Sequence, residues 1–163
     1  MEQLKVRVGT LDDLDPMMEL AMAATDENAF VKPDPAKLLA SIYPALARNH
    51  GIVGIIGEPK QRIEGAVVLN IGEIWYSTCE VLEEKAIYVH PEFRAAKGGR
   101  AARLVEFSKQ VSEEIGIPLA IGVLSTTRTA AKIRLYERML GQPAGVYFLY
   151  GATTGLKKEK EAG

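Results

Sequence analysis

Cysteine and histidine are scarce in this sequence, and their scarcity limits what can stabilise the fold. The single cysteine, Cys79, has no partner for an internal disulfide, and the two histidines, His50 and His90, are far apart in the chain. The sequence therefore offers no closely spaced Cys and His ligands of the kind that bind structural zinc. We expect a protein of a reducing compartment that contains no metal and depends on its apolar core.

An excess of positive charge and a long apolar run are missing as well. Lys and Arg number 20 against 21 Asp and Glu, which gives a net charge of -1, whereas nucleic-acid-binding proteins are usually basic. No apolar run is long enough to cross a bilayer, and residues 1–10, MEQLKVRVGT, lack the apolar stretch of a signal peptide. We expect a cytoplasmic protein that binds neither nucleic acid nor membrane, so any anion site must be local.

Apolar residues with regular spacing are what the sequence has in quantity. Its 163 residues and 47% hydrophobic content suffice for one well-packed core. We expect a single domain over residues 1–153. The last stretch, residues 154–163, mixes Lys and Glu without apolar partners and is typical of a charged, flexible tail.

The periodicity of the apolar residues predicts ten helices and strands. In chain order they are a strand in 4–10, helices in 13–24 and 34–50, strands in 51–57, 62–77 and 83–90, a helix in 99–115, a strand in 118–125, a helix in 128–140 and a strand in 145–152. Pro44 lies inside the second helical pattern, where we expect a kink or a break. This order, β-α-α-β-β-β-α-β-α-β, predicts an α/β (α+β) fold whose mixed sheet carries helices on both faces.

The junction at residues 90–107, HPEFRAAKGGRAARLVEF, joins an apolar strand to a helix. It places Arg94, Lys97 and Arg100 around a glycine pair, Gly98 and Gly99, where the helix begins. The first N–H groups of a helix have no internal partner and carry partial positive charge, so they attract anions such as phosphate. Glycine also lets a ligand approach the backbone closely. The same residues suit an ordinary turn with a solvated charged face, so both interpretations stay open.

The strand AIYV, the segment HPEFR and the glycine-containing turn into a helix resemble the acyl-CoA-binding signature of the GNAT N-acyltransferase superfamily. In that signature an Arg or Gln, two free positions, a Gly, one free position and a Gly or Ala wrap the pyrophosphate of coenzyme A. Arg94 matches the first position and Gly99 the last, whereas Lys97 stands where the first glycine is usual. One inserted residue would instead match Gly99 and Ala101. The order of the elements extends the resemblance over nearly the whole chain.

This resemblance implies a GNAT-like mixed, mostly antiparallel central sheet and acetyl-CoA as cosubstrate, without a metal. It implies a set of CoA-binding residues, namely the strand that would hold the pantetheine arm, the loop and helix start, and one threonine: Ile87, Tyr88, Val89, Arg94, Ala95, Ala96, Lys97, Gly98, Gly99, Arg100 and Thr129. The family commonly has an asparagine where this chain has STTRT, so Thr126 or Thr127 is an alternative to Thr129.

The resemblance also implies candidate catalytic residues. Tyr136, in RLYERML, falls where the family has a tyrosine that can protonate the departing thiolate, although a tyrosine in an amphipathic helix is often a packing residue. Glu83 and Glu84 begin the strand that often carries the general base. Neighbouring strand residues face opposite sides, so at most one reaches the cleft directly, and we favour Glu84. The alternatives are Glu73 and, for each acid, a place at the strand end facing solvent.

The function that the resemblance implies is acyl-CoA-dependent N-acyl transfer, most simply of acetyl to a primary amine of a small molecule or peptide by direct attack. The alternative is a non-catalytic module that binds acyl-CoA and regulates a partner. Asp26 and Glu27 are candidates to attract a cationic amine, and Trp75 and Tyr76 to shape its pocket. The apolar strand expected at 145–152 is compatible with a homodimer.

Overall fold

The computed structural model describes residues 4–94 and 98–152. Within these residues the chain forms a sheet with the strand order β1-β2-β3-β4-β5. The strands are β1 (Arg7–Val8), β2 (Gly51–Ile56), β3 (Gly65–Glu73), β4 (Glu80–Val89) and β5 (Leu119–Ala120). The first four pair antiparallel, and β5 pairs in parallel with β4. The sheet is therefore mixed and mostly antiparallel, as the sequence predicts.

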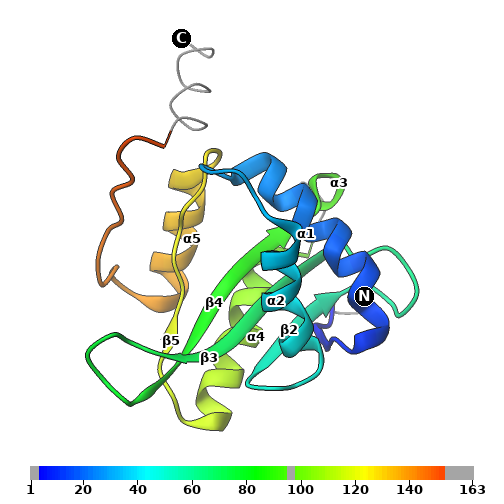
Figure 1. Cartoon of the computed structure of the whole chain (residues 1–163), viewed down its shortest axis with the longest axis horizontal. Helices are drawn as coiled ribbons and strands as arrows, with labels where there is room; N and C mark the ends of the chain where they lie inside the picture. Colours follow the sequence, from blue (N-terminus) through cyan, green and yellow to red (C-terminus); the bar gives the residue numbers. More distant parts are fainter. Residues whose placement is uncertain (1–3, 95–97, 153–163) are drawn as a thin grey trace.

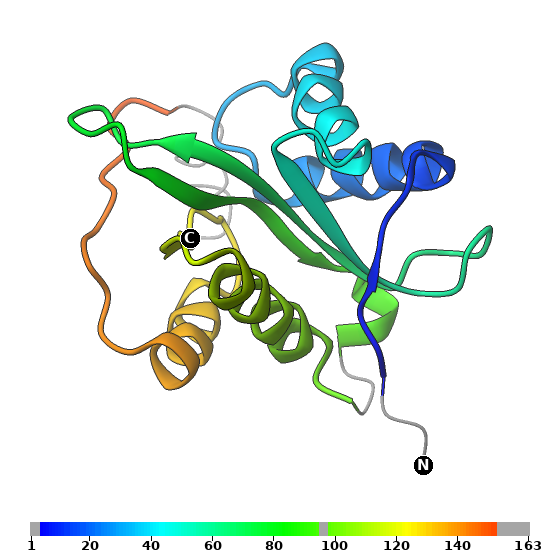
Figure 2. The ribbon, with the colours of Figure 1, turned by 90° about the horizontal axis from the view of Figure 1, so that it is seen from below.

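Helices cover both faces of this sheet (Figure 1). They are α1 (Leu14–Asn28), which follows the short 3-10 helix η1 (Leu11–Asp13), α2 (Pro35–Leu46), α3 (Pro91–Arg94), α4 (Arg100–Ile115) and α5 (Thr129–Leu140). Figure 2 shows α1 and α2 on one face and α4 and α5 on the other. The predicted arrangement of a sheet between two helical layers is thus confirmed.

Two apolar clusters hold the layers together, one on each face of the sheet. Both draw on the same strands, because successive side chains of a strand point to opposite faces. On one face Val68 of β3 packs in a cluster with Met17 of α1 and Leu46 of α2. Its neighbour Val67 packs in the other cluster with Leu104 of α4. All five side chains are buried. The period of the strands therefore fixes which face each helix covers.

The second helix begins where the sequence predicts and ends before residue 50, next to the expected break at Pro44. Asp34 is the N-cap of α2, its Oδ1 accepts the Ala36 N–H at 2.9 Å, and Pro35 takes the first helical position. Pro44 lies in the last turn, and the helix ends at Leu46. The expected break at Pro44 is therefore the end of the helix two residues later, since Pro44 has no N–H to donate to the carbonyl of Ala40 in the preceding turn.

The closing strand predicted at 145–152 is not formed in the structure. The described residues beyond Gly141 form neither helix nor strand, and five apolar residues in succession, Val146–Tyr150, are exposed. The strand predicted at 118–125 is also reduced, to the two residues of β5. A strand needs a hydrogen-bonding neighbour, and β5 offers a very short one. The predicted element order is confirmed as far as α5.

β4 and β5 diverge soon after they meet. Leu82 pairs with Leu119 and Glu83 with Ala120, and β4 then continues to Val89 paired with β3. A β-bulge leaves Lys85 without an opposite residue on β3, since Glu84 pairs with Leu69 and Ala86 with Val68. Bulges bend a strand and re-aim its side chains, and they are frequent beside functional sites. The fold therefore opens a gap beside the middle of β4.

Candidate active site

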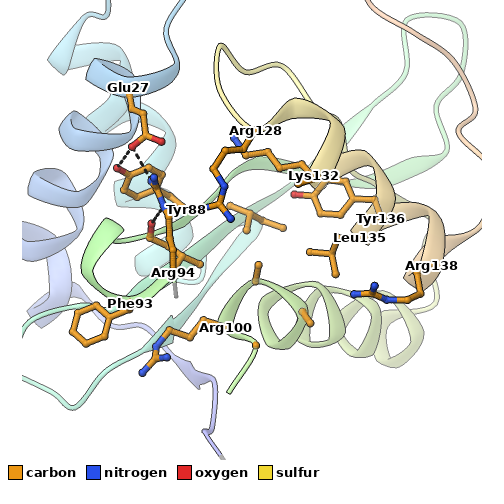
Figure 3. Close-up of a pocket in the computed structure, with 16 residues that line it drawn as sticks. Glu27, Tyr88, Phe93, Arg94, Arg100, Arg128, Lys132, Leu135, Tyr136 and Arg138 are labelled. Atoms are coloured by element: carbon orange, nitrogen blue, oxygen red, sulfur yellow. Dashed lines mark hydrogen bonds and ion pairs between the residues drawn. The ribbon is translucent and has the colours of Figure 1, made fainter. Parts of the chain in front are cut away.

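Two cavities lie beside this gap and share part of their walls. The narrower has a volume of about 270 Å³ and the wider about 680 Å³. Both are lined by Ile87 and Tyr88 of β4 and by Lys132 and Tyr136 of α5. They are therefore two parts of one cleft between β4 and α5, of which Figure 3 shows the narrower part.

The narrower cavity is strongly basic. Its wall carries five cationic side chains and one carboxylate, Glu27; the cations are Arg94, Arg100, Arg128, Lys132 and Arg138. Ala101 and Ala102, in the first turn of α4, also line it. The N–H groups of that turn have no partner inside the helix and add partial positive charge. Cations and a helix N-terminus together favour a phosphate group.

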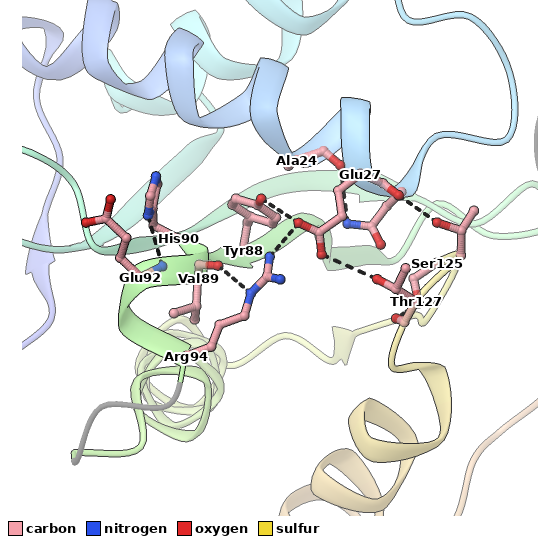
Figure 4. A network of polar contacts seen from close by, with 11 residues as sticks. Ala24, Glu27, Tyr88, Val89, His90, Glu92, Arg94, Ser125 and Thr127 are labelled. Atoms are coloured by element: carbon pink, nitrogen blue, oxygen red, sulfur yellow. Dashed lines mark hydrogen bonds and ion pairs between the residues drawn. The ribbon is translucent and has the colours of Figure 1, made fainter. Parts of the chain in front are cut away.

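Arg94 is held firmly in the wall of the narrower cavity (Figure 4). Its Nε donates to the Val89 carbonyl at 3.0 Å, and its Nη2 donates to Glu27 Oε2 at 2.7 Å. The guanidinium also lies 5.1 Å from the centre of the Tyr88 ring, within cation–π range. The hydrogen bond to Glu27 raises the pKa of Arg94, so the charge is permanent. Arg94 is thus a fixed cation rather than a mobile loop residue.

Glu27, in the last turn of α1, joins three parts of the cleft. Its carboxylate accepts the Tyr88 hydroxyl at 2.8 Å, Arg94 at 2.7 Å and Thr127 Oγ1 at 3.3 Å. Its carbonyl accepts Thr126 Oγ1 at 2.6 Å. Burial works against its ionisation, but the hydrogen bonds from Arg94 and Tyr88 outweigh burial and lower the pKa of Glu27. The residue is therefore charged and structural.

This position differs from the expectation that Glu27 and Asp26 attract a cationic acceptor. Glu27 already faces Arg94 in the narrower cavity, and Asp26 is exposed and lines neither cavity. Thr126 and Thr127, which the sequence suggested as residues that contact CoA, donate their hydroxyl groups to Glu27 instead. Sequence reasoning could not assign these contacts, because the partners are about a hundred residues apart.

Glu84 lies where β4 and β5 separate and lines the wider cavity. Its Oε2 accepts the N–H of Gly122, just beyond β5, at 3.4 Å. Burial raises the pKa of Glu84 to about 7, an effect that the Gly122 amide and the nearby Lys85 charge reduce in part. A carboxyl group with this pKa can both hold and release a proton near neutral pH.

Glu83 occupies the opposite side of β4. Its Oε2 accepts Lys85 Nζ at 2.7 Å, and its carboxylate lies over Gly72 of β3. Glu83 lines neither cavity. The alternation of a strand thus separates the two adjacent acids and leaves Glu84 as the one that reaches the cleft.

Tyr136, on α5, lines both cavities and shares the lining of the wider one with Glu84 of β4. Burial raises the pKa of Tyr136, and the negative charge of Glu84 raises it further. Its phenol therefore stays protonated at neutral pH. Figure 3 shows Tyr136 one turn beyond Lys132 on α5, and burial lowers the pKa of that lysine. The cleft thus places a potential proton acceptor and a potential proton donor on facing walls.

Several other predicted site residues are placed apart from the two cavities. Thr129 begins α5 and bonds to Ser125, with its Oγ1 3.0 Å from the Ser125 carbonyl, and it lines neither cavity. Gly98 has a φ of 120°, which suits glycine, and it too lines neither cavity, whereas Gly99 lines the narrower one. The predicted loop residues Ala95, Ala96 and Lys97 lie outside the described residues.

The remaining candidates lie on the hairpin between β3 and β4. Trp75 and Tyr76 have 94% and 70% of their surface exposed and contact each other edge to face, with ring centres 5.4 Å apart. Neither lines a cavity, and Glu73 at the end of β3 is likewise exposed and lines none. The structure therefore gives the two rings no part in the acceptor pocket, because the hairpin projects beyond the sheet (Figure 2).

Three cations of the narrower cavity, Arg128, Lys132 and Arg138, were missed by sequence reasoning. A signal was present, since Arg128, Lys132 and Tyr136 recur at a spacing of four residues and so share one face of a helix.

Among residues 4–94 and 98–152 no group of three or more His, Cys, Asp or Glu side chains could hold a metal ion. None of the helices described is both long enough and apolar enough to cross a membrane.

In the sequence comparisons, no family model matches the chain and no curated protein matches it. Solved structures match its fold. AAC(6')-Iy, in complex with the bisubstrate analogue CoA-S-monomethyl-acetylneamine, has 17% sequence identity and a TM-score of 0.67. That match covers 91% of this chain and 97% of the other.

Two further structures represent different acceptors. An aminoglycoside acetyltransferase from an uncultured soil metagenomic sample, in complex with sisomicin, has 18% identity and a TM-score of 0.62, covering 90% of this chain and 95% of that one. A ribosomal-protein-alanine N-acetyltransferase from Brucella melitensis has 15% identity and a TM-score of 0.58, covering 90% and 98%. At such identities the matches show the fold, which is GNAT-like, and leave the activity to be argued from the site.

Proposed function

We propose that the protein is a cytoplasmic acyl-CoA-dependent N-acyltransferase that moves an acetyl group from acetyl-CoA to a primary amine of a small molecule or peptide. The observation that carries the proposal is that Glu84 and Tyr136 both line the wider cavity, and that Tyr136 also lines the basic one. A basic cavity suits the phosphates of the cosubstrate, and the wider cavity suits the acceptor. The facing acid and base suit the proton transfers between them.

The narrower cavity is the proposed binding site for acyl-CoA. Arg94, Arg100 and the first turn of α4 would hold its pyrophosphate. The pantetheine arm would lie along Ile87–Val89, which line this cavity beyond the short pairing of β4 with β5. A ligand can therefore use backbone groups on the β4 edge that faces away from β3.

The proposed reaction divides two proton transfers between the facing walls. The neutral amine attacks the carbonyl carbon of the thioester with its nitrogen lone pair, and Glu84 takes the proton that the nitrogen loses as the bond forms. The nitrogen–carbon bond forms, the carbon–sulfur bond breaks, and the sulfur leaves with the bonding electrons. Tyr136 gives its proton to the sulfur and regains one from solvent, while Glu84 releases its proton to solvent. No covalent bond to the protein is needed, and Cys79 is exposed and lines neither cavity.

The rival function, a non-catalytic module that binds acyl-CoA, would use the basic cavity alone. Such a module has no need of a carboxyl group with a pKa of about 7 facing a protonated phenol. Perturbed acids and bases in a cleft are characteristic of catalytic sites, so the pair favours the enzyme.

The experiment incubates the protein with acetyl-CoA and a panel of primary amines. Free thiol reports released CoA, and mass spectrometry reports the acetylated amine. We expect acceptor-dependent release that matches product formation, with Glu84→Gln as the inactive control. Tight CoA binding by calorimetry without turnover of any amine would favour the regulatory module instead.

A further inference from the structure

The side chains that line the wider cavity carry a net positive charge, which does not suit a site for a simple cationic amine. Six charged side chains line it: Lys32, Lys37, Lys85, Lys132, Asp34 and Glu84. Three of them come from the α1–α2 connection and the first turn of α2, which form the wall opposite β4 and α5. The cations outnumber the carboxylates by two to one in this lining. Such a lining repels a polycation and attracts an anion.

The carboxylates in this wall are already engaged in other contacts. Asp34 accepts the Ala36 N–H at 2.9 Å as the N-cap of α2, and Glu84 accepts the Gly122 N–H at 3.4 Å. Of the lysines, Lys85 is paired with Glu83 at 2.7 Å. Asp34 keeps its negative charge as a cap, so Lys32 and Lys37 give the outer wall a net positive charge of one; both lysines are exposed at the mouth of the cavity.

The rest of the wall is apolar, with one hydrogen-bond acceptor set into it. Phe30, Val31 and Leu38 line the cavity beside the two lysines. Asn28 also lines it, and its Nδ2 donates to the Ala24 carbonyl at 3.2 Å. That bond fixes which side-chain atom is the oxygen, and Asn28 Oδ1 is buried without a hydrogen-bond partner in the described part of the chain. A buried acceptor of this kind suits an N–H donor on a ligand.

We infer that the acceptor is an amine that also bears a carboxylate and an apolar group, as an amino acid or a short peptide does. Lys32 and Lys37 hold the carboxylate at the mouth of the wider cavity, and Glu84 faces the amine inside it. This inference rests on the proposed function and narrows it to one class of substrate. It also separates the protein from its fold neighbour that binds sisomicin, because a polycationic amine meets like charges here.

The test compares acceptors in pairs that differ by the carboxylate alone: leucine with leucinamide, and phenylalanine with phenylalaninamide. We expect kcat/KM to be at least tenfold higher for the free acid in one or both pairs. A neighbouring carboxylate raises the pKa of the amine, so the chemical step alone favours the amide. A preference for the acid therefore reports recognition by the protein.

Variants locate the source of the preference. The double substitution Lys32→Gln with Lys37→Gln should raise KM for the acid about tenfold, leave kcat within twofold, and leave the amide unaffected. Lys37→Glu should reverse the preference toward the amide. The matched control is Lys60→Gln, an exposed lysine in the β2–β3 turn that lines neither cavity, and it should change nothing.

A binding measurement separates this inference from the proposed function. N-acetylleucine and N-acetylphenylalanine, and the corresponding amides, are titrated by calorimetry into the protein saturated with CoA. We expect each acid to bind at least fivefold more tightly than its amide and the double variant to lose the difference. Equal binding within both pairs, or tighter binding of the amides, overturns the inference even if amines are acetylated. Failure to acetylate any amine, with the binding difference intact, counts against catalysis instead.

Discussion

The two walls of the cleft are anchored to the core to very different degrees. β4 lies between β3 and β5, and its Val81, Leu82 and Tyr88 are buried. On the other side α5 has no buried residue, and between residues 121 and 152 Ala152 is the one residue that is buried. The proposed base, Glu84, thus stands on a wall fixed by the core, and the proposed acid, Tyr136, on a wall that is largely exposed. In the proposed mechanism the proton acceptor is therefore fixed by the sheet, whereas the position of the proton donor depends on how α5 is held.

Removal of the proposed base should have the largest effect. Glu84→Gln keeps the volume and removes the charge, and we expect kcat to fall about 10²–10⁴-fold. Glu83→Gln is the matched control, because Glu83 pairs with Lys85 and lines neither cavity. Steady-state kinetics with a turned-over amine checks both. Equal rates for the two variants would remove Glu84 from the mechanism.

The pH dependence of the same variants sharpens this result. Burial raises the pKa of Glu84 to about 7, so the wild-type kcat should rise with pH through about 7 as the carboxyl loses its proton.

The raised pKa of Glu84 also means that folding favours the protonated form of this carboxyl. The stability that this group contributes is complete below its ordinary pKa of 4.5 and is lost as the pH rises through about 7. Thermal unfolding at pH 8 should therefore show Glu84→Gln to be more stable than the wild type.

The proposed acid, on the exposed wall, should matter less. Tyr136→Phe keeps the ring and removes the proton donor, and we expect kcat to fall about 10²-fold, near the low end for a general acid. A thiolate with a pKa near that of cysteine, about 8.5, already leaves readily, so protonation helps it less. CoA affinity by calorimetry should be unchanged. An unaltered kcat where chemistry limits the rate would make Tyr136 a packing residue.

Local patterns in the sequence predicted the anchored wall well. Alternation along β4 predicted that Glu83 and Glu84 separate, and the Asp34–Pro35 pair predicted the start of α2. Contacts between distant segments could not be predicted in this way. Glu27 meets Tyr88 and Arg94 across 61 and 67 residues, and no periodicity encodes such a contact.

The exposed wall was predicted less well, because a strand there also depends on a partner segment that the local pattern does not show. The segment 145–152 has the composition of a strand, and β-branched and aromatic residues do favour strands. A strand is nevertheless defined by its neighbour, and the two-residue β5 supplies little edge for pairing. The face of α5 was readable in principle, since Arg128, Lys132 and Tyr136 repeat at helical spacing.

Loss of a cation from the exposed wall should weaken CoA binding by a smaller factor. Arg128→Gln removes a charge from the narrower cavity, and we expect the Kd of CoA to rise about tenfold, which corresponds to about 1.4 kcal/mol. Arg134→Gln, an exposed residue of α5 that lines neither cavity, is the control. Arg94 is a poorer choice, since its pair with Glu27 also supports the fold. Calorimetry at low salt should separate the two variants, and an identical Kd would exclude Arg128 from the phosphate contacts.

The smallest effect is expected in the exposed segment itself. Phe148 has 90% of its surface exposed, so Phe148→Ser should change the free energy of unfolding by less than about 0.5 kcal/mol. Leu82→Ala, in the anchored wall, should cost about 2–5 kcal/mol because Leu82 is buried. Denaturant unfolding at two protein concentrations checks both variants.

A homodimer in which a second copy covers Val146–Tyr150 would give a different result, since three aromatic side chains in each copy would then leave water. In that case the wild type would become more stable at higher concentration, and Phe148→Ser would abolish the concentration dependence. That outcome would show that the exposed segment Val146–Tyr150 is an interface between two copies.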